Sequence, residues 1–300
     1  MSVPGLLVER AGVHTTVQDA GRWGYQHLGV PVGGALDRDA LRQANWLVGN
    51  APDESVLEVT LVGCVLRSEV SMQVVVTGAT FDLRVDGRDV APGIVLALRP
   101  GQVLELGERR SGARAYVGVR GGLDAPVVLG SRSAWPLLPR RGALTDGTRL
   151  PVGTRIAGPV RAGAWPIERR SHVLRVLAGP DLPAAPQALA VLCATAYRVT
   201  AAASRMAYPL EGPAVPLLTP GRASSGTVTG AIQILPSGLP ILLMAERPTT
   251  GGYPIAAVVI TADAGAAAQL APGDQVRFAP VDQAAAVGAL LQHDSVRGDT

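Results

Sequence analysis

The stretch MQVVVTGATFDLRVDG at residues 72–87 contains two strand patterns followed by a turn signal. Its first part, residues 72–77, is a mostly apolar run of a length that suits a buried strand. Residues 81–85 alternate between apolar and polar side chains, as a strand with one buried face does. Asp86-Gly87 comes next, and this dipeptide favours the two-residue turn of a β-hairpin. The stretch therefore predicts an antiparallel sheet.

Short runs of the same kind recur along the chain and predict a protein that is mainly β. They lie at residues 94–98, 103–106, 114–119, 173–177, 232–235, 241–245, 257–261 and 275–278. The 36 Gly and 24 Pro are spread between these runs, which indicates frequent turns. Such spacing favours barrels or sandwiches. A few helices are expected at residues 37–48, 186–198 and 282–291, the first of them capped by Asp37.

A segment rich in Gly, Pro and Arg at residues 158–170 indicates a boundary between two domains near residue 165. We therefore expect one β domain over residues 1–165 and a second over residues 166–285. Residues 286–300 are expected to form a frayed tail. A chain of 300 residues is long enough for two ordinary domains.

All 27 basic residues are arginine, and the absence of lysine excludes several kinds of chemistry. Schiff-base catalysis, a P-loop, a biotin-bearing lysine and the Ser-Ser-Lys amidase triad all require that residue. Two distant cysteines and four histidines predict no metal site. The arginines are scattered and predict no nucleic-acid binding, and no apolar run is long enough to predict a membrane span. We therefore expect a cytoplasmic protein.

Polar and titratable side chains are dense among the glycines of residues 12–50. Candidate site residues here are Gln18, Asp19, Arg22, Tyr25, His27 and Asp37. Glycine lets the backbone approach a ligand closely, while the side chains offer charge and hydrogen bonds. The alternative for Asp19 and Arg22 is a local ion pair that steadies a loop.

A second candidate segment, MAERPTTGGYP at residues 244–254, follows an apolar strand. Its candidate site residues are Glu246, Thr249, Thr250, Gly251, Gly252 and Tyr253. Exposed backbone N–H groups and two hydroxyls make the loop a reasonable cradle for a carboxylate or another anion. The alternative is a tight turn in which Glu246 pairs with an arginine. We predict that this loop and the segment at residues 12–50 face one small-molecule ligand.

Arg132 lies in a third polar stretch, GSRS at residues 130–133. Its guanidinium group has the geometry to bind a carboxylate or phosphate with two hydrogen bonds. A surface arginine in a polar loop is the alternative.

Several motifs occur in one order along the chain and resemble a known family. They are GVHTTVQD at residues 12–19, GR at 21–22, GY at 24–25, GVP at 29–31, LEVT at 57–60, TGA at 77–79, RAY at 114–116, GGLD at 121–124, LGSRS at 129–133, RM at 205–206, GAIQ at 230–233, TTGGYP at 249–254 and PGD at 272–274. The chain resembles the family variously called the 5-oxoprolinase C subunit, KipA, allophanate hydrolase subunit 2 and biotin-dependent carboxyltransferase-like. The resemblance spans residues 5–280.

This resemblance implies a fold of two cyclophilin-like β-barrel domains. It also implies two partners, a KipI-like B subunit (allophanate hydrolase subunit 1-like) and an A subunit. In 5-oxoprolinase the three subunits form a hetero-oligomer, a hydrolase that opens 5-oxo-L-proline to L-glutamate with ATP. ATP is thus the cofactor of the full complex, although no nucleotide-binding motif stands in this chain. The chain is expected to be inactive alone.

Under this interpretation the catalytic residues are Asp19, Arg22 and Tyr25, and the other candidate residues bind the substrate. The sequence departs from the family pattern at three positions of the second half. Ser225 stands where Glu is usual, Glu246 where Asp is usual, and Pro248 where Gln is usual.

Two other functions remain open from the sequence. The first is carboxyl transfer between carboxybiotin and urea or a related amide, as in urea amidolyase, which would make biotin the cofactor. The second is a non-enzymatic role, in which a KipA-like protein binds a KipI-like kinase inhibitor.

Overall fold

A computed structural model describes residues 4–135, 142–161, 171–181, 187–216 and 223–297. The chain divides into two compact units. The first comprises Met1–Trp23 and Gly33–Arg169, and the second comprises Gly24–Val32 and Arg170–Thr300. The predicted domain boundary at residue 165 falls at residues 162–170, outside the described residues.

The first unit is built on a curled sheet of nine strands. The strands are β1 (Gly5–Arg10), β2 (His14–Gln18), β3 (Val56–Thr60), β4 (Val65–Ser68), β5 (Met72–Val85), β6 (Arg88–Val90), β7 (Leu96–Leu98), β8 (Val103–Val119) and β9 (Arg149–Pro151). Six of them follow the order β2-β3-β8-β4-β1-β9, and β5 pairs with β6, β7 and β8. The predicted hairpin is confirmed, since Asp86 and Gly87 both have positive φ and join β5 to β6. The two strands expected at residues 103–106 and 114–119 are one continuous strand, β8.

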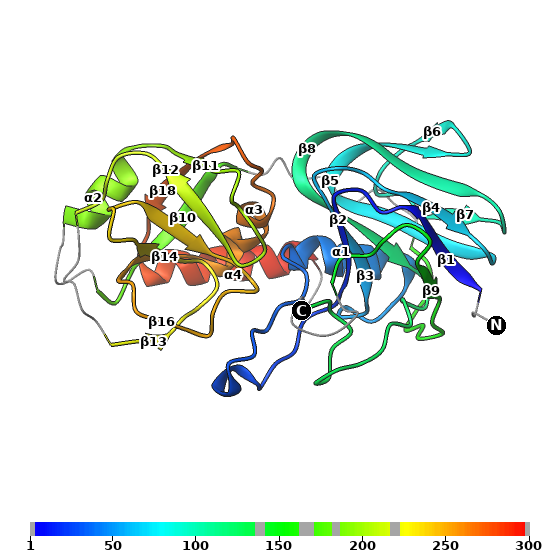
Figure 1. The fold of residues 1–300 in the computed structure, drawn as a ribbon, viewed down its shortest axis with the longest axis horizontal. Coiled ribbons are helices and arrows are strands. Elements are labelled where there is room, and N and C mark those ends of the chain that lie inside the picture. Colours follow the sequence, from blue (N-terminus) through cyan, green and yellow to red (C-terminus); the bar gives the residue numbers. More distant parts are fainter. Residues whose placement is uncertain (1–3, 136–141, 162–170, 182–186, 217–222, 298–300) are drawn as a thin grey trace. The chain divides into compact units, whose positions relative to one another are not determined.

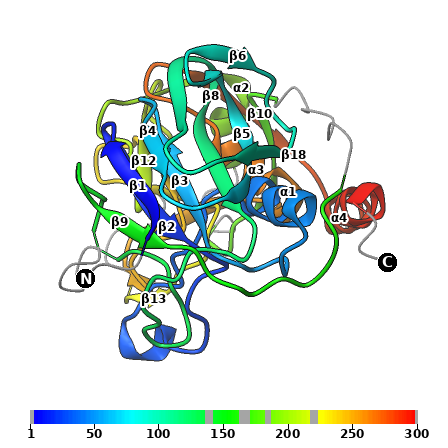
Figure 2. The same ribbon diagram turned by 90° about the vertical axis from the view of Figure 1, so that its right-hand side faces the viewer.

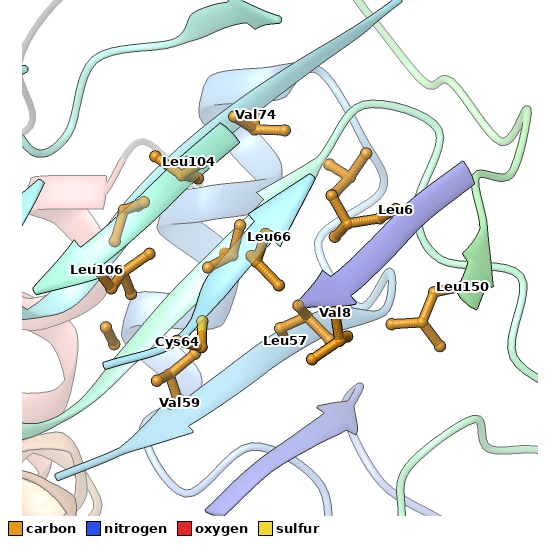
Figure 3. Close-up of a cluster of buried hydrophobic side chains, with 14 of the residues drawn as sticks. Leu6, Val8, Leu57, Val59, Cys64, Leu66, Val74, Leu104, Leu106 and Leu150 are labelled. Atoms are coloured by element: carbon orange, nitrogen blue, oxygen red, sulfur yellow. The ribbon is translucent and has the colours of Figure 1, made fainter. Parts of the chain in front are cut away.

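One face of this sheet encloses an apolar core. Its strands contribute alternate Leu and Val side chains, because successive residues of a strand point to opposite faces. Figure 3 shows ten of the buried side chains converging between the strands: Leu6, Val8, Leu57, Val59, Cys64, Leu66, Val74, Leu104, Leu106 and Leu150. Burial of each large aliphatic side chain contributes about 1.5–3 kcal/mol.

Helix α1 (Arg38–Val48) packs against β5 and β8 (Figure 1, Figure 2). Asp37 caps it as predicted, since its carboxylate accepts a hydrogen bond from the Ala40 N–H at 3.1 Å. The buried face of the helix contains Leu41, Ala44 and Leu47. This helix therefore fixes the end of the polar segment that precedes it.

The second unit contains a closed barrel of seven strands in the order β10-β17-β14-β15-β12-β11-β18. These strands are β10 (Val173–Ala178), β11 (Tyr197–Val199), β12 (Ala207–Glu211), β14 (Ala231–Ile234), β15 (Pro240–Leu243), β17 (Ile255–Val259) and β18 (Gln275–Pro280). Parallel pairing of β10 with β18 closes the barrel. The short strands β13 (Ser225–Gly226) and β16 (Thr250–Gly251) pair beside it (Figure 1). The mainly β, barrel-type fold predicted from the sequence is confirmed.

The described residues also contain further helical elements. They are the 3-10 turns η1 (Gln26–Leu28) and η3 (Thr261–Asp263) and the helices α2 (Gln187–Ala194), α3 (Ala264–Ala268) and α4 (Gln283–Arg297). The helix expected at residues 186–198 ends early, because Tyr197–Val199 pairs with β12 and β18. Residues 286–297 of the tail expected to fray at residues 286–300 are helical in α4, and the last three residues lie outside the described residues.

Candidate functional site

Asp19 is the centre of a hydrogen-bonded cluster in the first unit. Its Oδ1 accepts hydrogen bonds from the Gly21 N–H at 2.8 Å and from the hydroxyls of Ser131 at 2.6 Å and Ser133 at 2.5 Å. Its Oδ2 accepts one from the Arg132 N–H at 2.5 Å. We call Asp19, Gly21 and residues 131–133 the Asp19 cluster. The donors surround both carboxylate oxygens, so Asp19 ties two loops together that are more than 100 residues apart in the sequence.

Arg22 joins the same cluster from the other side of Ser133. Its Nη2 donates a hydrogen bond to the Ser133 carbonyl at 2.5 Å, and its guanidinium lies 5.7 Å from the Trp135 ring centroid. The side chain is buried. The structure thus connects Asp19 and Arg22 through Ser133, where the sequence suggested a direct ion pair as the alternative to a ligand site.

The segment at residues 34–37 packs on the Asp19 loop. The Ala35 N–H donates to the Asp19 carbonyl at 2.9 Å. Gly34 has a φ of 80°, and a Cβ atom there would lie 2.7 Å from the Gly21 nitrogen, so a larger residue would push the two loops apart. Asp37, which was predicted to bind substrate, is fully buried and caps α1 instead.

Glu58 and Tyr116 hold this segment from the sheet, and neither was predicted as a site residue. Glu58 Oε2 accepts hydrogen bonds from the Leu36 N–H at 2.9 Å and from the Tyr116 hydroxyl at 2.8 Å. The Tyr116 oxygen in turn accepts one from the Asp37 N–H at 2.8 Å. The two residues form a cross-strand pair of β3 and β8, which the sequence alone does not indicate.

The remaining predicted residues of the first half have different surroundings. Gln18 is fully buried in β2 and donates to the Thr16 hydroxyl at 2.9 Å. The Arg132 side chain contacts Asp124 at 3.1 Å. Tyr25 and His27 belong to the second unit, where Tyr25 is half-buried and His27 is exposed.

In the second unit, Glu246 forms an ion pair with Arg205. The Arg205 Nε donates to Glu246 Oε1 at 2.7 Å, and the two side chains are only 7% and 11% exposed. The Glu246 N–H also donates to the Arg205 carbonyl at 3.0 Å. We call these residues the Arg205–Glu246 pair. The alternative given for Glu246, an arginine partner at a turn, is thus confirmed.

Arg247 secures the start of the loop that follows. It is buried, and its guanidinium donates to the Thr229 hydroxyl at 2.9 Å and to the Thr227 carbonyl at 3.1 Å. The Thr227 hydroxyl donates in turn to the Pro248 carbonyl at 2.5 Å. Pro248, which departs from the family pattern, takes part through its backbone carbonyl. Any other residue at this position would offer the same acceptor.

The predicted TTGGY loop is shaped by strand pairing. Thr250 and Gly251 form β16, which pairs with Ser225 and Gly226 of β13. The Tyr253 carbonyl accepts a hydrogen bond from Gln233 Nε2 at 3.3 Å, while its side chain is 46% exposed. Thr250 and Gly252 are exposed, and Thr249 and Gly251 are half-buried. The exposed loop residues are available to contact a ligand.

The two groups of candidate residues have different chemistry. Hydroxyl and backbone donors surround a carboxylate in the Asp19 cluster, whereas a buried ion pair and a buried arginine precede the loop in the second unit. Whether they face a common ligand stays a prediction. Within the described residues, no group of three or more His, Cys, Asp or Glu side chains gathers to hold a metal ion. No helix in this part of the chain is both long and apolar enough to cross a membrane.

The family model described as "Carboxyltransferase domain, subdomain A and B" matches residues 28–280. The chain belongs to this carboxyltransferase-domain family. A member named as the C subunit of 5-oxoprolinase, from Escherichia coli K12, is 35% identical over 279 residues, which cover 91% of this chain and 90% of the relative. The family resemblance inferred from the motifs is therefore confirmed.

Two solved structures are similar to this chain in fold and in sequence. The structure of TTHA0988 superposes with a TM-score of 0.83 at 33% identity and covers 93% of this chain. The structure of Kluyveromyces lactis urea amidolyase superposes with a TM-score of 0.84 at 25% identity and covers 99% of it. This chain spans 56% of TTHA0988 and 20% of the urea amidolyase chain. The fold of this chain thus occurs within longer chains.

Proposed function

We propose that this carboxyltransferase-family chain is the C subunit of an ATP-dependent 5-oxoprolinase. In this proposal it works with the A and B subunits to open 5-oxo-L-proline to L-glutamate. The observation that carries the proposal is the 35% identity to a protein named as the C subunit of 5-oxoprolinase, which extends over nine-tenths of both chains.

The chemistry explains why ATP and several subunits are needed. A lactam carbonyl is a poor electrophile, and phosphorylation of its oxygen would produce an activated imidate that water can attack. This chain has no lysine and no nucleotide-binding motif. We therefore assign ATP to the assembled complex and give this chain a part in holding the substrate.

The candidate residues divide into those that shape the site and those available to bind. Asp19 already accepts four hydrogen bonds, so we propose that it shapes its loops and does not act as a general base. 5-Oxoproline carries a carboxylate, which suits the hydroxyls and N–H groups of the loop at residues 249–253 of the second unit. Tyr25, at the start of η1, adds a half-buried phenol.

Reconstitution of the complex tests the function directly. The purified A and B subunits, this chain, ATP and 5-oxo-L-proline should together release L-glutamate. Omission of this chain or of ATP should abolish the release, and this chain alone should be inactive. Release at the full rate without this chain would contradict the proposal.

Carboxyl transfer is the second candidate, because the fold superposes on urea amidolyase with a TM-score of 0.84 over 99% of this chain. This reaction would require a separate biotin carrier, since the chain has no lysine to bear biotin. Transfer of labelled carboxylate from such a carrier to urea or a related amide, without glutamate release from 5-oxoproline, would favour this second function.

A further inference from the structure

The Glu58–Tyr116 pair is fully buried, yet it is polar and carries a charge. Burial of a carboxylate costs several kcal/mol unless hydrogen bonds and an opposite charge offset it. Glu58 has both, because Tyr116 and the Leu36 N–H donate to it and the Arg114 Nε lies 3.8 Å from its second oxygen. An apolar pair would fill the same space between the sheet and α1 without this cost, so the polar pair requires a specific explanation.

The hydrogen bonds of this pair lead to the Asp19 cluster in a continuous path. Glu58 and Tyr116 fix the N–H groups of Leu36 and Asp37. The neighbouring Ala35 N–H bonds to the Asp19 carbonyl. The Asp19 carboxylate then holds residues 131–133. Every residue in this path belongs to the first unit.

Tyr116 is suited to a fixed role as a donor. Burial first, and then the nearby charges of Glu58 and Asp37, raise the pKa of its phenol well above the usual range. The hydroxyl therefore stays protonated at neutral pH, where it donates to Glu58 and accepts from the Asp37 N–H. The hydrogen bonds of Tyr116 are therefore not lost through deprotonation of its hydroxyl at neutral pH.

We propose that Glu58 and Tyr116 are positioning residues, which fix the Asp19 cluster through the backbone of residues 35–37. They act through the backbone and do not touch the substrate. This inference rests on the proposed function only where turnover is measured, because the positioning itself can be measured on the isolated chain.

Tyr116→Phe tests the proposal, since it removes one hydroxyl and leaves the ring in place. Tyr197→Phe is the matched control, because Tyr197 is equally buried and its hydroxyl bonds to the Pro213 carbonyl in the second unit. We expect the N–H groups of Gly21, Arg132 and Ser133 to exchange with deuterium about tenfold faster in Tyr116→Phe, the factor for one buried hydrogen bond. The control should leave these groups unchanged.

Turnover in the assembled complex provides the second measurement. Tyr116→Phe should lower kcat about tenfold and change KM by no more than about twofold, while Tyr197→Phe should leave both unchanged. Glu58→Gln keeps one acceptor oxygen but leaves the buried Arg114 guanidinium without its carboxylate, so it should be less stable than Tyr116→Phe and should speed exchange of the same N–H groups at least as much. Unchanged exchange in residues 19–21 and 131–133, or an equal change in the control, would overturn the proposal. If the wild-type complex releases no glutamate, the proposed function fails, and the exchange measurement still decides the positioning.

Discussion

Asp19 in the first unit and Glu246 in the second are both carboxylates held by hydrogen bonds, but their donors differ in kind. Two serine hydroxyls and two backbone N–H groups surround Asp19. A single arginine, Arg205, neutralises Glu246. Neutral donors fix the position of a carboxylate through geometry, whereas an arginine also compensates its charge.

This difference determines what a substitution does. Removal of one member of a buried ion pair leaves an uncompensated charge, and that penalty exceeds the net value of the pair. Removal of Asp19 leaves neutral donors that can rotate or bind water, so the cost is smaller but several loops lose their common anchor. Substitutions in the Arg205–Glu246 pair should therefore mainly lower the free energy of unfolding. Substitutions of Asp19 should mainly change the geometry of the loops that it joins.

The largest effect is expected from Arg205→Ala, which leaves Glu246 buried without its cation. We expect a loss of about 3–5 kcal/mol in the free energy of unfolding. Urea denaturation measures this loss, and Glu246→Gln combined with Arg205→Ala should recover part of it, because the charge is then absent.

Arg198→Ala is the control within the same unit. Arg198 pairs with Glu211 on the surface, where the two side chains are 63% and 52% exposed, so the change should cost less than about 1 kcal/mol.

Labelling of the two cysteine thiols, Cys64 and Cys193, reports which unit opens in Arg205→Ala. Burial raises the pKa of Cys64 to about 12 in the core of the first unit, while Cys193 is half-buried in α2 of the second. Early labelling of Cys64, and not Cys193, in Arg205→Ala would contradict the assignment of the damage to the second unit.

Asp19→Ala should have a moderate effect on stability and a larger one on function. We expect a loss of about 2–3 kcal/mol in the free energy of unfolding, since four donors lose a charged acceptor. Turnover in the reconstituted complex should be abolished while the three subunits still co-elute in size-exclusion chromatography. Asp82→Ala removes a half-buried carboxylate of the same unit, which pairs with Arg110, and should preserve turnover. Turnover of Asp19→Ala at the wild-type rate would show that the cluster is only structural.

Local features of the fold could be predicted from the sequence, because they depend on neighbouring residues. The hairpin at Asp86-Gly87 and the cap of α1 by Asp37 follow from turn and capping preferences, and both are confirmed. The early end of α2 was not predictable in this way. Tyr197 lies in an alanine-rich stretch with helical character, but its pairing with β18, distant in sequence, prevails over that local preference.

The candidate site shows the same limit. Asp19 and the stretch at residues 130–133 were both identified as polar loops, but no sequence spacing indicated that Ser131 and Ser133 would bind Asp19. Glu58 and Tyr116 were noted only within motifs of the family, since a buried acid in a strand has no recognisable local pattern. Contacts between distant segments decide which polar residues meet, and a single sequence does not contain that information.

Glu54 accepts hydrogen bonds both from an arginine, Arg155, and from the neutral donors of Ser55. Its substitution should have the smallest effect on stability of those considered, and this effect should depend on pH. Burial by itself would raise the pKa of its carboxyl, but hydrogen bonds from Arg155 and Ser55 outweigh it, so the pKa is lowered. A lowered pKa in the folded state contributes stability above the unfolded pKa of about 4.3, and this contribution is lost as the pH falls through the folded value. Glu54→Gln should therefore cost about 1 kcal/mol at pH 7 and progressively less below pH ~4, when unfolding by urea is followed from pH 7 to 3. Glu108→Gln, at a side chain that is 70% exposed, should change stability little at either pH. A cost for Glu54→Gln that grew as the pH fell would mean that burial, and not the arginine and serine donors, controls this carboxylate.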